Sequence, residues 1–289
     1  MTGAPEWFNA AIEAPVTRKK ILVEGAEIET LSWGDVGRPG LLFVHGNGAH
    51  ADWWRPFAPL FSDQYRVGGF SFSGMGHSAW RPEYSYDIHR KELAAAAESL
   101  GLFAGPQKPW IVAHSIGGLP ALLEVAGEGG ERFGGLILAD TGFAPPPVDP
   151  FTNRKKWVSP IFATREEGVS RFRLRPAQEC PNPWLLNFIG LHSLSEVESG
   201  GWRWSFDPDS DATRGLISDD AVEHALGNAK CPLAFVWGEQ SAIITPEVVE
   251  TNRNMTPPQT PFVGIPSAGH HLMVDQPLAF VSAVRGLLP

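Results

Sequence analysis

Residues 110–118 read Trp110-Ile111-Val112-Ala113-His114-Ser115-Ile116-Gly117-Gly118, and this stretch decides the fold. Its first four residues form an apolar run of strand length, and the segment that begins at Leu119 favours a helix. Small residues at Ala113 and Gly117 allow a turn tight enough to project the Ser115 hydroxyl from the edge of a sheet. The stretch therefore predicts a strand, a sharp turn and a helix, with a nucleophilic serine at the tip of the turn.

Short apolar runs bounded by turn residues recur along the chain, after an opening antiparallel hairpin. They are continuously apolar rather than alternating, which is typical of a sheet buried on both faces by crossover helices. We therefore predict an α/β protein with a mostly parallel eight-stranded sheet and helices on both of its faces. The predicted strands are Ile21–Glu24, Ile28–Trp33, Leu41–His45, Arg66–Phe70, Trp110–Ala113, Gly135–Ala139, Leu233–Trp237 and Pro261–Ile265, and the clearest helices are Tyr86–Leu100, Leu119–Val125 and Pro277–Leu288.

The alternation of strands and helices stops between Asp140 and Cys231. Pro145-Pro146-Pro147 and Pro150 form a stiff exit, and the residues that follow contain no obvious buried strand. We predict an inserted helical cap at residues 143–229, and a core formed by residues 1–142 and 230–289. The helices expected in the cap are Arg165–Phe172, Trp184–Ser193 and Asp219–Leu226.

The composition limits the partners of the protein. The chain has 289 residues, of which 43% are hydrophobic, enough for a sizeable core, and this excludes disorder for most of its length. A formal charge of −9 repels nucleic acid, so we expect a small-molecule substrate and no nucleic-acid partner. The sequence contains no apolar run long enough to span a membrane and no signal-peptide pattern, and its two cysteines are not spaced as C-x-x-C. We expect a cytoplasmic protein with reduced thiols; the oligomeric state is left open.

Two further loops complete the set of candidate catalytic residues. The run Leu41–Val44 ends in His45-Gly46-Asn47-Gly48, where we expect the backbone N–H of Asn47 to form an oxyanion hole together with that of Ile116. Gly269-His270-His271 follows the last predicted strand. A histidine on a loop at the carboxyl edge of a parallel sheet is where a general base would meet Ser115.

In their order and spacing these motifs resemble the α/β-hydrolase superfamily, over about residues 20–142 and 230–289. The resemblance rests on the Ser115 turn and on His45-Gly46-Asn47-Gly48, Ser71-Phe72-Ser73-Gly74-Met75-Gly76-His77-Ser78 and Gly269-His270. It implies that Ser115 is the nucleophile and His270 the base, while His271 matches a variable position. No cofactor is expected. No metal site is expected either, because the other histidines lack a matching carboxylate or a partner at helical spacing.

The catalytic acid is where the chain departs from the family pattern. The family usually carries an aspartate in the turn after the seventh strand, but Ser241 and Ala242 stand there in this chain. Glu239 lies in the same turn, directly after a glycine. Asp140 ends the sixth strand, which is where some haloalkane dehalogenases and zearalenone-lactonase-like hydrolases place their acid. We favour Asp140 as the acid and keep Glu239 as the alternative; a third interpretation makes Asp140 a solvated strand end.

The nucleophile decides the expected reaction. Dehalogenases and epoxide hydrolases of this fold attack with an aspartate, whereas a serine, a histidine and an acid imply acyl transfer. We therefore predict a serine hydrolase that cleaves an ester or a lactone of a hydrophobic or aromatic small molecule through an acyl-enzyme on Ser115. We expect Trp53, Trp54 and Trp184 to line the substrate pocket, although the same rings would also serve to join the cap to the core.

Three alternatives stay open at this point. Relatives of the same fold cleave carbon–carbon bonds with the same three residues, and others are cofactor-free lyases or dioxygenases in which the serine and histidine move protons. A displaced acid is also compatible with a ligand-binding member that has lost catalysis.

Overall fold

The computed structural model describes residues 3–143, 159–210 and 217–289. A mixed sheet of eight strands runs through it in the order β1-β2-β4-β3-β5-β6-β9-β10. β1 and β2 form an antiparallel hairpin, β2 also pairs antiparallel with β4, and all other neighbours are parallel. The prediction of a mostly parallel eight-stranded sheet is confirmed. Its strands are β1 (Thr17–Val23), β2 (Ala26–Trp33), β3 (Gly40–Val44), β4 (Arg66–Phe70), β5 (Trp110–His114), β6 (Gly135–Ala139), β9 (Leu233–Gly238) and β10 (Phe262–Ile265).

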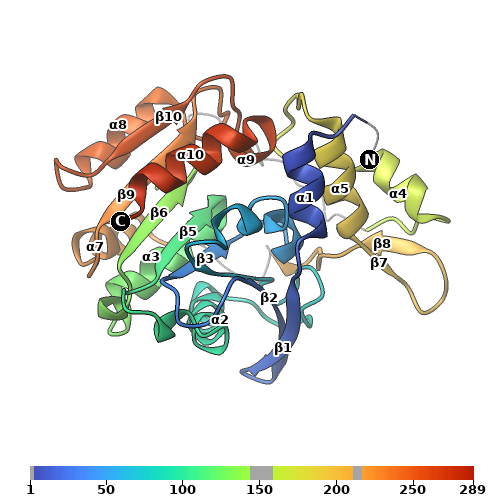
Figure 1. The fold of residues 1–289 in the computed structure, drawn as a ribbon, viewed down its shortest axis with the longest axis horizontal. Helices are drawn as coiled ribbons and strands as arrows, with labels where there is room; N and C mark the ends of the chain where they lie inside the picture. Colours follow the sequence, from blue (N-terminus) through green and yellow to red (C-terminus); the bar gives the residue numbers. More distant parts are fainter. Residues whose placement is uncertain (1–2, 144–158, 211–216) are drawn as a thin grey trace.

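Both faces of the sheet are buried. Alternate residues of β3 point to opposite faces, so Leu41 and Phe43 join one hydrophobic cluster while Leu42 and Val44 join the other. α2 (Tyr86–Ser99) and α3 (Gly118–Ala126) cover one face, and α10 (Pro277–Leu287) covers the opposite one (Figure 1). α8 (Pro246–Asn254) and the short α9 (Leu272–Asp275) complete the C-terminal part of the core. Continuously apolar strands thus produce the two-faced core that the sequence predicts.

The inserted segment contains a hairpin that the sequence analysis did not predict. Its described part consists of α4 (Arg165–Arg171), α5 (Pro183–His192) and the antiparallel pair β7 (Leu194–Glu196) and β8 (Trp202–Trp204). These strands are only three residues long and half-buried or exposed for the most part, so they carry no apolar run to recognise. The Pro145–Pro150 stretch, predicted as the exit from the core, lies outside the described residues.

α7 (Asp219–Gly227) lies with the core and not with the cap. It packs on α3, and Val222, Ala225 and Leu226 belong to the same hydrophobic cluster as residues of β6 and β9. The helix expected at Asp219–Leu226 is thus present and packs on the core helix α3, while the cap bounds of residues 143–229 stay a prediction.

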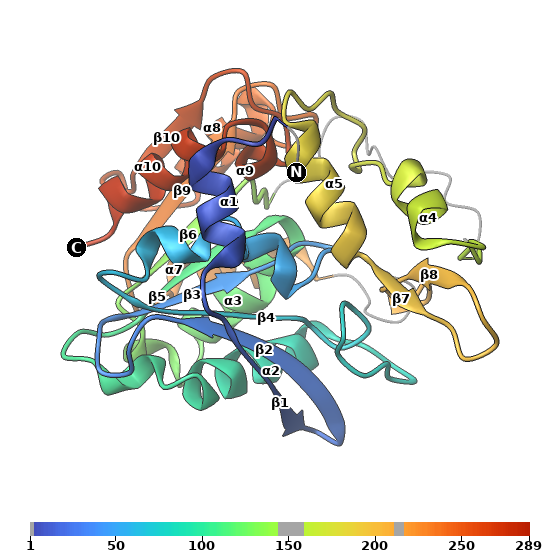
Figure 2. The same cartoon turned by 45° about the vertical axis from the view of Figure 1, so that its right-hand side comes forward.

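An N-terminal helix, α1 (Glu6–Glu13), lies beside α5 of the cap (Figures 1 and 2). The Phe8 ring packs 4.5 Å from the Trp184 ring and 5.8 Å from the Phe188 ring, measured between centroids. The first helix of the chain thus packs on α5 through aromatic contacts. Within the described residues, no helix combines the length and the apolar character that crossing a membrane requires.

Candidate active site

Ser115 stands at the turn between β5 and α3 in a left-handed backbone conformation, with a φ of 54°. A non-glycine residue in this region is strained and persists only where its surroundings hold it. Gly117 permits the turn, because a Cβ at that position would lie 2.3 Å from the carbonyl oxygen of His45. The predicted sharp turn is therefore present, and it leaves the Ser115 side chain half-buried at the carboxyl edge of the sheet.

The structure brings Ser115, His270 and Asp140 into one hydrogen-bonded chain. His270 Nε2 lies 2.9 Å from Ser115 Oγ, and His270 Nδ1 lies 2.6 Å from Asp140 Oδ1. In this arrangement the serine hydroxyl donates to the imidazole, and the imidazole N–H donates to the carboxylate. His270 and Asp140 are both buried, so water does not compete for these bonds.

Asp140 directly follows β6 and also has a left-handed backbone, with a φ of 46°, which aspartate tolerates better than most residues. The end of the neighbouring strand β9 and the turn after it each supply one donor to its carboxylate. The backbone N–H of Gly238 donates to Oδ2 at 2.9 Å, and the Ser241 hydroxyl donates to Oδ1 at 2.7 Å. The alternative acid, Glu239, is exposed, and no hydrogen bond to His270 is found for it.

Ser241 was not among the predicted site residues. It occupies the turn where the family usually carries the acid, and here it supports an acid that comes from the adjacent strand. The sequence does contain the signal, since Ser241 stands where the family aspartate is missing. What the sequence did not show is that β6 and β9 are neighbours.

The loop expected to form the oxyanion hole lies against the Ser115 turn, because β3 and β5 are adjacent parallel strands. A Cβ on Gly46 would lie 3.0 Å from the Cβ of Ser115, so only glycine allows this approach without displacement. His45 fixes the loop: its Nδ1–H donates to the Gly46 carbonyl at 2.7 Å, and its Nε2 accepts from Phe72 N–H at 3.0 Å. Burial lowers the pKa of His45 to about 4, consistent with this neutral tautomer.

The two predicted oxyanion donors lie next in sequence to residues of this contact, Asn47 after Gly46 and Ile116 after Ser115. Asn47 is exposed on the β3 loop, and Ile116 follows the serine in the first turn that leads into α3. Backbone N–H groups at such a turn point toward the position where a tetrahedral oxyanion develops.

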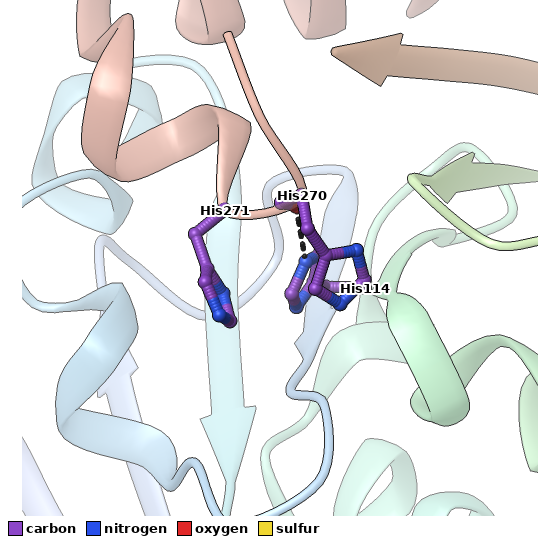
Figure 3. A group of neighbouring side chains, drawn as sticks. All are labelled: His114, His270 and His271. Carbon is purple, nitrogen blue, oxygen red and sulfur yellow. Dashed lines mark hydrogen bonds between the residues drawn. The ribbon is translucent and has the colours of Figure 1, made fainter. Parts of the chain in front are cut away.

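Three imidazoles, those of His114, His270 and His271, gather at the site (Figure 3). Their candidate ligand nitrogens lie within 4.8 Å of one another, which is close enough to bind one metal ion. However, both ring nitrogens of His270 are already bonded to Ser115 and Asp140. His114 Nε2–H donates to the His270 carbonyl at 3.0 Å, and His271 Nε2–H donates to the Arg175 carbonyl at 3.1 Å. These bonds suit proton transfer and loop support better than metal binding.

Burial, reinforced by the nearby His270, holds the pKa of His114 and of His271 well below the usual range for histidine. Both imidazoles are therefore neutral around His270. His271 makes no hydrogen bond to Ser115, so His270 is the histidine that the geometry couples to the serine.

Of the three tryptophans expected in the pocket, only Trp53 lies beside these histidines. Its ring centroid is 5.3 Å from that of His271 and 6.4 Å from that of Phe172 in the cap. Trp184 instead contacts Trp7 and Phe8 of the N-terminal segment. These contacts place Trp184 between α1 and α5, and its expected place in the pocket stays a prediction.

Trp54 lies in the hydrophobic core, and its expected place in the pocket is corrected. The ring stacks on Phe43 at 5.0 Å and on Phe280 at 6.3 Å, and the side chain is 1% exposed. Two adjacent tryptophans on a short 3-10 helix must point in different directions, which the sequence does not reveal.

We expect Trp54→Ala to lower the free energy of unfolding by about 3–5 kcal/mol, because it leaves a large cavity between the sheet and α10. Urea denaturation followed by circular dichroism measures this loss. Trp53→Ala is the comparison, and it should reduce stability less than Trp54→Ala does. Equal losses would contradict the assignment of Trp54 to the core.

Comparisons with known proteins point to one family. A sequence model described as "Alpha/beta hydrolase family" matches residues 41–284. An esterase of Mycobacterium tuberculosis, Rv0045c, is 24% identical over 97% of this chain and 92% of its own length.

Solved structures of the same fold include a thioesterase domain and a hydrolase. The thioesterase domain from the curacin biosynthetic pathway has a TM-score of 0.77 and 21% identity, covering 94% of this chain and 99% of its own. E-2-(acetamidomethylene)succinate hydrolase has a TM-score of 0.78 and 17% identity, and the match covers 94% of this chain and 98% of that enzyme. At these identities the likeness supports the fold, whereas the family model and the esterase relative support a hydrolase.

Proposed function

Because this chain belongs to the alpha/beta hydrolase family, we propose that it is a serine hydrolase that cleaves a carboxylic ester or lactone through an acyl-enzyme on Ser115. One observation carries the proposal: the continuous hydrogen bonding from Ser115 through His270 to Asp140, at 2.9 and 2.6 Å. The esterase name of the M. tuberculosis relative agrees with it. The proposed roles are nucleophile for Ser115, general base for His270 and acid for Asp140.

The proposed reaction begins when His270 Nε2 takes the Ser115 proton and the serine oxygen attacks the carbonyl carbon. The N–H groups of Asn47 and Ile116 hold the oxyanion that forms. His270 then returns the proton to the leaving alcohol oxygen as the ester C–O bond breaks. Water attacks the acyl-enzyme with His270 again as base, which releases the acid and restores Ser115. Asp140 stabilises the imidazolium in both halves of the reaction.

We propose a hydrophobic or aromatic acyl group for the substrate. Trp53 supports this choice, since its ring is 5% exposed and lies next to His271 and the cap residue Phe172. Large aromatic side chains of this kind favour apolar ligands, and a few polar groups then fix orientation. A lactone differs only in that its alcohol stays attached to the acyl-enzyme, so the same residues serve both substrates.

A fluorophosphonate probe tests the acyl-enzyme chemistry. We expect the probe to label folded protein once per chain at Ser115, as shown by peptide mass spectrometry, and to leave Ser115→Ala unlabelled. Hydrolysis of p-nitrophenyl esters should fall in parallel with labelling. Absence of labelling and of ester hydrolysis in folded protein would count against a serine hydrolase, and would favour a proton-transfer lyase or dioxygenase, or a ligand-binding role.

A further inference from the structure

A segment of the cap lies against the loop that carries His270. This segment, residues 172–182, connects α4 to α5, and the loop comprises residues 267–276. Side chains and carbonyls from the segment bond to the loop at several points. Asn182 Nδ2 donates to the carbonyls of Val274 and Asp275 at 2.9 Å each, and His271 Nε2–H donates to the Arg175 carbonyl. The cap is therefore tied to the loop of the proposed base.

Gln178 of this segment forms a hydrogen bond with the backbone of His271, the residue that follows His270. Its Oε1 accepts from the backbone N–H of His271 at 3.0 Å, and its Nε2 donates to Asp275 Oδ2 at 2.7 Å. The same carboxylate oxygen accepts from the backbone N–H of Gly269 at 2.7 Å. Gln178 and Asp275 together thus hold the two peptide N–H groups that stand on either side of His270.

The packing at this contact is close. A Cβ on Gly269 would lie 3.2 Å from the amide atoms of Gln178, so the glycine allows the side-chain amide to approach the loop. Asp275 is 4% exposed, and within the described part of the chain its Oδ1 has no hydrogen-bond partner. Burial raises the pKa of Asp275, and the donors Gly269 and Gln178 oppose that rise. Loss of Gln178 would leave a buried carboxylate with a single donor.

We propose that Gln178 is a positioning residue for His270, so that the cap completes the geometry of the base. The proposal rests on the proposed function, in which His270 takes the Ser115 proton. The hydrogen bonds of Gln178 go to Asp275 and to the backbone of His271, so it acts by holding the peptide groups on either side of the His270 side chain. Displacement of a catalytic group by about 1 Å can cost about 10²-fold in rate. An amide that fixes the loop from the cap therefore controls turnover without taking part in the chemistry.

The first test replaces Gln178 by leucine, which keeps the volume and removes both hydrogen bonds. We expect kcat for a p-nitrophenyl ester to fall about 10- to 100-fold while KM changes less than about threefold, because the base and not the pocket is displaced. The matched control is Glu179→Gln, at the exposed neighbouring position, which should leave both constants unchanged.

The second test, Gln178→Glu, distinguishes the loss of the hydrogen-bond donor to Asp275 from a general disturbance of the folded structure. The introduced carboxyl faces Asp275, and the other titratable groups nearby are His270, His271 and Cys180. Two adjacent carboxyls share one proton and release it at a raised pKa. While that proton is bound, it supplies the donor that the amide supplied. As pH rises through the raised pKa the donor is lost and the two charges repel.

We therefore expect the ratio of kcat in Gln178→Glu to kcat in the parent protein to fall about tenfold or more between pH 6 and pH 8.5. The same ratio for Gln178→Leu should change less over this pH range, because that variant lacks the second carboxyl beside Asp275.

The outcomes separate this proposal from the proposed function. Failure of the parent protein to hydrolyse esters and to be labelled at Ser115 overturns the function itself. With an active parent, a leucine variant that retains kcat within about twofold overturns the positioning role of Gln178. If the leucine variant does not fold, the glutamate variant decides, and a pH-independent ratio then overturns the proposal.

Discussion

Asp140→Asn is expected to lower kcat for ester hydrolysis by a factor of about 10³ to 10⁴ with little change in KM. The asparagine would keep the shape of the side chain but replace a carboxylate that accepts from His270 at 2.6 Å. The imidazole then loses the partner that selects its tautomer and stabilises its charged form. Steady-state kinetics on protein shown to be folded by circular dichroism measure the effect.

Glu239→Gln is the control for this prediction, because it tests the other acid that the sequence offers. Glu239 is exposed, so we expect kcat to stay within about tenfold of the parent value. A larger loss for Glu239→Gln than for Asp140→Asn would overturn the assignment of the acid. It would also require a rearrangement in which the turn after β9 reaches His270.

His270→Ala is expected to have the largest effect of all, a loss of about 10⁶ in kcat. Removal of the base leaves the serine proton without an acceptor, and variants of catalytic serines and histidines in serine proteases lose activity on this scale. Single-turnover measurement with an activated ester detects the residual rate. Fluorophosphonate labelling of Ser115 should slow in parallel.

His271→Gln provides the matched control at the adjacent position. His271 is buried, and its ring donates to the Arg175 carbonyl rather than accepting from Ser115. We expect a loss of kcat no greater than about tenfold, from altered packing beside Trp53. If His271→Gln were the less active of the two variants, the base would have to be reassigned.

The sequence was sufficient to predict the residues whose chemistry depends on a local pattern. Ser115 lies between an apolar strand and a helix, and a glycine two residues later makes the turn recognisable. His270 was found from its place after the last strand. Asp140 was considered only because the usual aspartate after the seventh strand is missing. In the structure it contacts His270, since β6 lies between β5 and β9 in the sheet.

Other features depend on contacts between distant segments, and no local pattern predicts them. Gln178 meets His271 across 93 residues, and a single glutamine in a Pro-containing loop carries no periodic signal. Trp53 and Trp54 look equivalent in sequence, but the fold turns one toward the cap and the other into the core. α1 was not predicted, because its apolar residues are buried by α5, which lies far away in the sequence.

The support that Ser241 gives to Asp140 bears on how catalytic ability is recognised in distant relatives. A search that requires an aspartate at the position of Ser241 or Ala242, in the turn after β9, would classify this chain as a degenerate enzyme. The strands β6 and β9 are parallel neighbours and end at the same edge of the sheet, so a carboxylate that follows either one can approach the same imidazole nitrogen. Surveys of inactive homologues should therefore ask whether any acid lies within hydrogen-bond distance of histidine Nδ1, rather than which alignment column contains it.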